Sequence, residues 1–411
     1  MSFDRLIAAA VDLRWLDAGR ARVYGLLLAL GLAAMTVWLL LAPRTDTPLG
    51  GDFLSFYAAS KLLLAGHGAV VWRPDLHEAA ELSVVSGLHG YLAFFYPPPY
   101  LLLCWPLALL PFAASFAVWA IGTSLLALLA MALFLRSAGA RIRGAGLALL
   151  AFPALWLNIL AGQNGALSLA ILAAGFALLA RHPFAAGAVL GVLVIKPQLA
   201  IALPFVLAAS GRWRTFGATA ASALVLLAIG AAVVGPDGVA AFLANGVNAR
   251  AALDEGRVDP ALMQSLFGAL RVAGAPLGFA YAAQVIMAVL VLVAACYAAG
   301  RARYSAAALG AITVAATLLT TPFMLDYDLL IAALPVGWLL LEGHRTGFRS
   351  GEKLACIAIA VMPLFTRTLA SATHLQVAPI FLLALLAMVV LRARGPSEDR
   401  ASVLVASVER D

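Results

Sequence analysis

An aspartate stands directly after the first long apolar run of the chain, in the stretch Gly50-Gly51-Asp52-Phe53-Leu54-Ser55-Phe56-Tyr57. Glycines before Asp52 and aromatic residues after it predict a constrained, partly buried turn, in which burial tunes the basicity of a carboxylate. An isolated aspartate at such a place can also be a helix cap or a solvated loop acid. We interpret Asp52 as a candidate catalytic base, because an ionisable group at the edge of a membrane span is costly.

A lysine interrupts another apolar segment, at Lys196-Pro197-Gln198. The apolar runs on its two sides, residues 184–195 and 199–209, are each about half as long as a membrane crossing, so we expect two half-helices that meet at the lysine near mid-depth. A lysine there is expensive unless it faces a polar cavity or an anion, and we interpret Lys196 as a phosphate-binding residue. In the alternative interpretation, its ammonium group snorkels to the outer headgroups.

Two further pairs of polar residues are of types found in binding or catalytic sites, but their spacing does not define one kind of site. Asp326 and Asp328 alternate across a break between apolar runs, where a metal or acid/base site and a helix cap are equally consistent with the pattern. Gln163-Asn164 fits either sugar binding or a tight turn. The histidines show no ligand spacing, and the sequence contains no nucleotide-binding loop and no metalloprotease motif. Nucleotide-dependent chemistry on a soluble domain is therefore not expected.

The composition indicates the class of protein in which these residues lie. The chain has 411 residues, of which 64% are hydrophobic and 11% are charged, and this excludes a water-soluble domain. We predict an all-α polytopic membrane protein. The net charge of +7 comes from arginines scattered between apolar runs, a placement that indicates membrane orientation and not nucleic-acid binding. The three cysteines are far apart within apolar runs and are expected to be inert packing residues.

The apolar runs predict one integral membrane domain over residues 1–394 and a polar cytoplasmic tail over residues 395–411. Outer loops are expected at residues 43–97 and 235–274, and residues 101–110, bounded by prolines, are expected to be re-entrant or interfacial. The remaining apolar runs, taken as spans in addition to the two half-helices, are residues 23–42, 113–135, 147–160, 166–179, 216–234, 277–299, 305–319, 329–341, 354–369 and 377–391.

The positive-inside rule gives the expected orientation. Most of the 27 Lys and Arg residues fall on one side, which places the N-terminus in the cytoplasm of a multi-pass protein of the inner (plasma) membrane. The other side keeps Arg44, Arg73, Arg250, Arg257, Arg271, Arg367, Lys61 and Lys196. This topology predicts that one extracytoplasmic cavity is faced by Asp52, Tyr96, Gln163, Asn164, Lys196, Gln198, Gln264, Ser265, Asp326 and Asp328.

Five motifs in order carry a resemblance to a known family. They are Gly-x-Asp before a tyrosine, Phe-x-Tyr-Pro-Pro, Gly-Gln-Asn, Lys-Pro-Gln and Met-Gln-Ser-Leu-Phe-Gly-Ala-Leu-Arg. Over residues 22–394 the chain resembles the polyprenol-phosphate-mannose-dependent mannosyltransferases of glycosyltransferase family 87, which belong to the GT-C fold class. The resemblance implies a bundle of about 10 to 12 transmembrane helices, with short re-entrant or half-helices and extracytoplasmic loops.

The resemblance also implies an activity and roles for residues. A hexose, typically mannose, would pass from a polyprenyl-phosphate sugar to a lipid or glycan acceptor on the outer face, in one inverting displacement with Asp52 as base. Lys196 would bind the donor phosphate with Arg250, Arg257 and Arg271. Because such a donor carries its own leaving group, neither a metal nor another cofactor is expected. Where the family often carries a histidine, within residues 321–328, this chain has acids. The expected substrate-binding residues are Tyr57, Tyr96, Gln163, Asn164, Gln198, Gln264, Ser265, Asp326 and Asp328.

Two rival classes also account for a polar cavity within the membrane. A transporter or flippase of a lipid-linked sugar would need alternating access, and such proteins often contain inverted repeats. No repeat is evident in the sequence, and the polar residues concentrate in two outer loops, which favours an enzyme. A purely structural membrane subunit is disfavoured by Lys196 and by the acids. The expected partners are the lipid-linked donor, the acceptor and membrane lipids, without nucleic acid.

Overall fold

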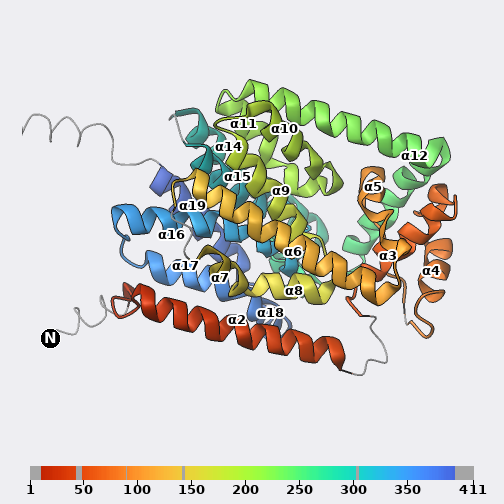
Figure 1. Ribbon diagram of the computed structural model, residues 1–411, viewed down its shortest axis with the longest axis horizontal. Coiled ribbons are helices and arrows are strands. Elements are labelled where there is room, and N and C mark those ends of the chain that lie inside the picture. Colours follow the sequence, from red (N-terminus) through yellow and green to blue (C-terminus); the bar gives the residue numbers. More distant parts are fainter. Residues whose placement is uncertain (1–10, 43–48, 89, 141–143, 302–304, 394–411) are drawn as a thin grey trace, which may run out of the picture.

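The computed structural model describes residues 11–42, 49–88, 90–140, 144–301 and 305–393. Within these ranges the chain forms helices and no β-strand, apart from an isolated bridge between Met263 and Leu325. The expected all-helical architecture is confirmed (Figure 1). The expected polar tail, residues 395–411, and Arg44 lie outside the described residues.

Four of the described helices are long and apolar enough to cross a membrane: α2 (Ala18–Leu41), α6 (Phe112–Ser137), α12 (Trp213–Asp254) and α14 (Leu277–Arg301). A fifth crossing is reached if α17 (Glu352–Val361), with η8 (Met362–Leu364), is joined to α18 (Thr366–Thr373) across a 65° bend. The protein is thus a membrane protein, but the expected count of about 10 to 12 spans is not confirmed.

The other apolar runs are divided into shorter helices, and proline is one cause. Pro153, Pro183 and Pro197 each begin a new helical segment, because proline is tolerated in the first turn of a helix but not inside it. The shorter segments are α3 (Phe53–Leu64), η1 (Gly68–Val70), α4 (Pro74–Leu82), η2 (Pro98–Tyr100), α5 (Leu101–Cys104), η3 (Leu107–Leu109), α7 (Ala145–Leu150), α8 (Pro153–Ala161), α9 (Gly165–Leu178), α10 (Pro183–Gly191), η4 (Val192–Ile195), η5 (Pro197–Ala200), α11 (Ala202–Ala209), η6 (Pro260–Leu262), α13 (Leu266–Val272), α15 (Ala306–Thr320), η7 (Asp326–Ala332), α16 (Ala333–Thr346) and α19 (Ala378–Ala393).

Helix α15 forms the centre of the bundle. All of its residues are buried, and it packs against α9, α11, α14, α16 and α19. A helix surrounded in this way must be largely apolar, as the sequence AAALGAITVAATLLT is, and the hydroxyls of Thr313 and Thr320 donate to backbone carbonyls of the same helix. Residues 321–328, which include Asp326 and Asp328, follow its C-terminal end and lie at one end of the bundle.

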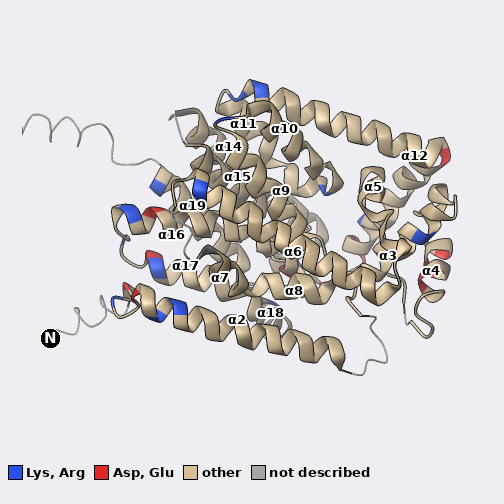
Figure 2. Cartoon of the chain, viewed as in Figure 1, with Lys and Arg blue, Asp and Glu red and all other residues tan. Residues whose placement is uncertain are grey.

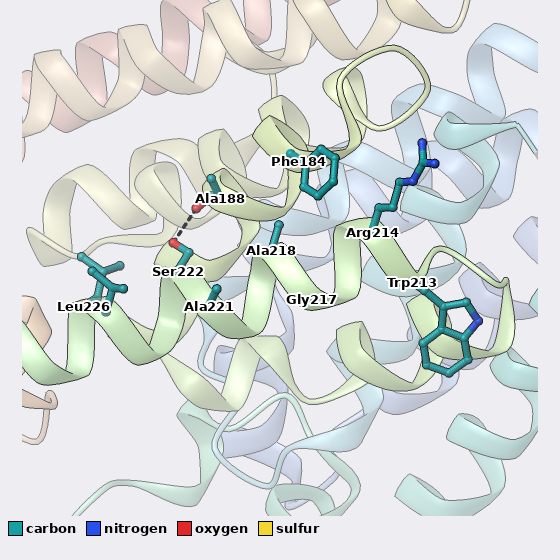
Figure 3. Close-up of a pocket in the computed structure, with 10 residues that line it drawn as sticks. Phe184, Ala188, Trp213, Arg214, Gly217, Ala218, Ala221, Ser222 and Leu226 are labelled. Carbon is teal, nitrogen blue, oxygen red and sulfur yellow. Dashed lines mark hydrogen bonds between the residues drawn. The ribbon is translucent and has the colours of Figure 1, made fainter.

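The segment around Lys196 is a helical hairpin. Gly187 of α10 lies against Thr215 and Ala218 of α12, and Gly191 lies against Thr219 and Ser222, so α10 and α12 run in the same direction. Because α11 joins them, it must return to the end where α10 began. Ser222 Oγ donates a hydrogen bond to the carbonyl of Ala188 at 2.8 Å, where the two helices touch (Figure 3). The expected pair of half-helices meeting at Lys196 is therefore present.

Helix α12 corrects one expected boundary. Residues 235–254 were expected to belong to a loop, but they continue as helix after a kink at Gly235, whose φ of 72° departs from helical values. The following Pro236 cannot donate a backbone hydrogen bond, and this favours a kink at that point. The second half of α12 bends back toward the α3–α4 region (Figure 1), where Phe242 packs on Trp72 with ring centroids 5.6 Å apart.

Charges concentrate at the two ends of the bundle. Figure 2 shows basic residues gathered near α16, α17 and the start of α2, and a second group of charges near α3, α4 and the bend of α12. At the first of these ends, Arg212, Arg345 and Arg392 line one hollow together with the beginning of α15. The long helices between the two ends are almost free of charge, as a protein surrounded by hydrocarbon requires.

Candidate functional site

A cavity of about 610 Å³ lies at the end of the bundle where α15 ends. Its walls come from stretches far apart in sequence: the start of α3, residues 91–97, the turn after α8, the break at Lys196, the second half of α12 with η6, and residues 323–327. Most of these stretches are, or include, connections between helices. The cavity is therefore built where the helical elements end, which leaves side chains free to point into it.

A tight glycine turn positions Asp52. Gly50 and Gly51 both have positive φ values, 72° and 50°, and the backbone N–H of Asp52 donates to the carbonyl of Ala161 at 3.0 Å. Gly162 follows Ala161 and lies against the same turn: a Cβ added to Gly162 would come 2.0 Å from the carbonyl oxygen of Gly50. Only glycine fits there, because side chains clash at this approach and disfavour the left-handed conformation.

The carboxylate of Asp52 points into the site and does not cap α3. Asp52 precedes the first residue of α3, but its side chain makes no capping hydrogen bond. Its Oδ2 instead accepts a hydrogen bond from Gln163 Nε2 at 2.7 Å. Burial raises the pKa of Asp52, while this hydrogen bond and the charge of Lys196 act in the opposite direction. A carboxylate with a raised pKa is a stronger base than a solvated one.

Lys196 is held inside the protein by three groups. Its Nζ donates to Asp328 Oδ1 at 2.5 Å and to Asn164 Oδ1 at 3.0 Å, and it lies 5.3 Å from the ring centroid of Tyr327. Only 2% of the lysine is exposed, so its ammonium group does not snorkel toward the membrane surface. Asp328 and Asn164 are fully buried and do not line the cavity, and they contribute to it by fixing Lys196.

The cavity brings together part of the set expected from the sequence. Asp52, Tyr96, Gln163, Lys196, Gln198 and Arg257 all line it. Asn164 and Asp328 lie behind Lys196. The remaining expected residues do not line it: Tyr57, Arg250, Arg271, Gln264, Ser265 and Asp326.

Three of these residues have other partners. Tyr57 donates from its hydroxyl to the carbonyl of Leu110 at 2.9 Å and packs inside the aromatic core. Arg250 is exposed and pairs with Asp254 one helical turn away, at 3.3 Å. Arg271 donates to the carbonyl of Ala275. None of these three residues lines the cavity, and their roles in binding substrate or donor phosphate stay predictions.

The other three fix the loops around the cavity. Ser265 caps α13 by accepting from Gly268 N and donates to the carbonyl of Pro322 at 2.6 Å. Gln264 Oε1 accepts from Thr366, which ties the same loop to α18. Asp326 accepts from the backbone N–H of Tyr327, and burial raises its pKa to about 6. These residues support the site and do not line it.

Several cavity residues were not expected from the sequence. Tyr91, Asn248 and Tyr327 line the cavity, together with the apolar side chains of Phe242 and Phe323. Phe242 and Asn248 belong to the second half of α12, which was expected to be a loop. A helical reading of residues 236–254 would have predicted one shared face for Phe242, Asn245, Asn248 and Ala252, which recur every three or four residues.

Comparison with known families supplies the identity. The model of glycosyltransferase family 87 matches residues 94–322, which is more than half of the chain. The chain belongs to glycosyltransferase family 87. No curated protein and no solved structure matches it. As a family 87 protein with several candidate membrane spans, it is a membrane glycosyltransferase.

The matched range covers only part of the cavity. Tyr96, Gln163, Lys196 and Arg257 fall within the family 87 match, whereas Asp52 and Asp328 lie outside it. Asp52 joins the matched residues through its hydrogen bond to Gln163, and Asp328 joins them through Lys196. The cavity is thus our candidate active site of this family 87 enzyme.

Proposed function

We propose that the protein transfers a hexose, with mannose as the first choice, from a polyprenyl-phosphate sugar to a hydroxyl of a lipid or glycan acceptor on the extracytoplasmic face. The observation that supports this most directly is that a carboxylate with a raised pKa, Asp52, and a buried ammonium group, Lys196, line the same cavity. These are the two charges that transfer from a phosphate leaving group requires.

The proposed reaction is a single inverting displacement. Asp52 accepts the proton of the acceptor hydroxyl as its oxygen attacks the anomeric carbon, and the bond between that carbon and the phosphate oxygen breaks. The lipid phosphate leaves with the bonding electrons. Lys196 stabilises the negative charge that develops on it, and Arg257 is a second cation on the cavity wall. The donor carries its own leaving group, so the expectation that no metal or other cofactor is needed stays part of the proposal.

The composition of the wall supports a lipid-linked donor. Beside the charged residues, the cavity is lined by apolar side chains from α12, η6 and the segment after α15: Phe242, Val258, Leu262, Phe323 and Leu325. Apolar surface of this kind takes up hydrocarbon more readily than a free sugar nucleotide. The extracytoplasmic placement rests on the gathering of arginines at the opposite end of the bundle.

The test is a product assay with the purified protein in liposomes. Polyprenyl-phosphate sugars are supplied with cell-envelope lipids as acceptors, and products are sought by mass spectrometry. We expect a glycosylated acceptor from the native protein and about a 10²- to 10⁴-fold lower rate from Asp52→Asn. Asp237→Asn, which changes an exposed acid at the kink of α12, is the control and keeps full activity. Full turnover by Asp52→Asn would exclude it as the base, and sugar movement without a covalent product would favour a transporter.

A further inference from the structure

Gln163 uses both ends of its side-chain amide within the protein. Its Nε2 donates to Asp52 Oδ2 at 2.7 Å, and its Oε1 accepts from the hydroxyl of Tyr96 at 2.8 Å. The side-chain amide of Gln163 cannot flip by about 180° while Asp52 is ionised, because the amide oxygen would then face the carboxylate oxygen of Asp52. The chain from Tyr96 through Gln163 to Asp52 therefore has a defined direction.

The three residues come from different parts of the chain and are each held in place. Gln163 is 5% exposed and follows Gly162, which packs directly on the turn that carries Asp52. Tyr96 is stacked on Tyr100, with ring centroids 4.2 Å apart and an interplanar angle of 20°. The position of Gln163 relative to Asp52 is therefore fixed by packing of the backbone and the aromatic rings, and not by the hydrogen bonds alone.

We propose that Gln163, with Tyr96 behind it, is a positioning residue: it anchors Oδ2 of Asp52, so that Oδ1 takes the proton of the acceptor hydroxyl. This inference rests on the proposed function. It changes the role expected for Gln163 from the sequence, which was sugar binding. An amide already engaged at both ends has one N–H left, and it is better suited to orienting the base than to recognising a sugar.

The hydrogen bond also has an electrostatic consequence that can be measured. Donation to the ionised carboxylate opposes the effect of burial on the pKa of Asp52, so removing the donor raises that pKa further. The other titratable groups whose charges interact with Asp52 are Lys196, Glu81, Asp326, Tyr96 and Tyr327. A Gln163 substitution leaves these side chains in place, although Tyr96 loses the acceptor of its hydrogen bond, so a shift reports the loss of the chain from Tyr96 through Gln163 to Asp52.

The first measurement needs no substrate. The carboxyl stretch of Asp52 is followed by infrared difference spectroscopy of the purified protein across pH, with Asp52→Asn as the spectral reference. Gln163→Met, which keeps the length of the side chain but removes the donor, is expected to move the midpoint to higher pH. Gln198→Met is the matched control, because it makes the same substitution at another glutamine of the same cavity. It is expected to leave the midpoint of the Asp52 titration in place. An unchanged midpoint in Gln163→Met would overturn the inference.

The second measurement uses the transferase assay. In Gln163→Met we expect kcat to fall about 10- to 100-fold, as for loss of a hydrogen bond to a charged group, with little change in KM and with the acidic limb of the pH profile moved upward. A rise in KM alone would instead show that Gln163 binds the sugar. If Gln163→Met does not fold, Tyr96→Phe must shift the infrared midpoint in the same direction. Absence of any product from the native protein would defeat the proposed function and leave the infrared result standing.

Discussion

At the scale of single residues, the site depends on a buried ion pair. Lys196 and Asp328 are 2% and 0% exposed, and their charged atoms are 2.5 Å apart. Asn164 completes the group, but the Nδ2 of Asn164 and the Oδ2 of Asp328 are buried without a hydrogen-bond partner among the described residues. A buried pair of this kind contributes little net stability, yet it is costly to break because one charge is then left alone.

This asymmetry predicts the result of a double-mutant cycle. Asp328→Asn leaves the ammonium group of Lys196 buried without its counter-charge, and we expect it to lower the free energy of unfolding by about 3–5 kcal/mol. Adding Lys196→Met to this variant removes the unpaired charge and restores most of the stability, but not transfer activity. Denaturant or thermal unfolding in detergent, together with the product assay, checks both parts. If the two substitutions were additive in stability, the pair would not be coupled in the folded protein.

The sequence predicted residues of the site better than it predicted their contacts. Asp52 and Lys196 were singled out because Asp52 stands at the edge of a membrane span and Lys196 interrupts an apolar run, and a charge at either place is costly whatever its neighbours are. Tyr57 and Arg271 carry the right chemistry, but composition does not determine which way a side chain points. The pair Asp326 and Asp328 shows this directly, because Asp326 accepts a hydrogen bond from the backbone N–H of Tyr327 and Asp328 pairs with Lys196.

At the scale of elements, α4 supports one wall of the cavity through a buried pair. His77 and Glu81, one helical turn apart, are both fully buried, with Nε2 and Oε1 3.6 Å apart. The other oxygen of Glu81 accepts from the backbone N–H of Leu92, which lines the cavity. Burial raises the pKa of Glu81 to about 8 and lowers the pKa of His77 to about 4, so near neutral pH both side chains are mainly uncharged.

The pair predicts that stability falls as the pH rises from 6.5 to about 8. Below its folded pKa, Glu81 keeps a proton that the unfolded chain has already lost, so stability falls as the pH rises from 4.5 to about 8. His77 acts with the opposite sign, but only between pH 4 and 6.5. From pH 6.5 to 8 Glu81 acts alone in this pair.

Glu81→Gln removes this dependence while keeping an acceptor for Leu92. The unfolding temperature of the native protein is expected to fall more steeply between pH 6.5 and 8 than that of Glu81→Gln. Asp75→Asn, an exposed acid of the same helix, retains the native slope. Parallel slopes for the native protein and Glu81→Gln would mean that Glu81 is ionised throughout this range.

Helical elements could be predicted where one signal dominated. Lys-Pro at the middle of an apolar run correctly indicated two half-helices, because proline begins a helix and lysine is costly within one. The kink of α12 falls where the span over residues 216–234 was expected to end, but the helix that follows the kink was not predicted. Gly235-Pro236 is also a common helix end, and the face carrying Phe242 and Asn248 becomes visible only if the chain is read as helical beyond it.

At the scale of the whole molecule, the fold separates two ends with different chemistry. The hollow lined by Arg212, Arg345 and Arg392 includes the beginning of α15, and the cavity includes the segment after its end. The 15 residues of α15 separate them by about 22 Å, which is less than the hydrocarbon thickness of a typical bilayer. The expected number of spans is not confirmed, because prolines divide several of the apolar runs into helices shorter than a membrane crossing.

The orientation of these two ends is the last prediction. In a background without Cys104, Cys296 and Cys356, single cysteines are introduced as Asp75→Cys near the cavity and Ser350→Cys at the arginine-rich end, both exposed positions. A membrane-impermeant maleimide added to right-side-out vesicles is expected to label Asp75→Cys at once and Ser350→Cys only after permeabilisation, because arginines gather on the cytoplasmic side. The reverse pattern would place the cavity in the cytoplasm. Transfer on the outer face would then be wrong, although the family assignment, which rests on residues 94–322, would stand.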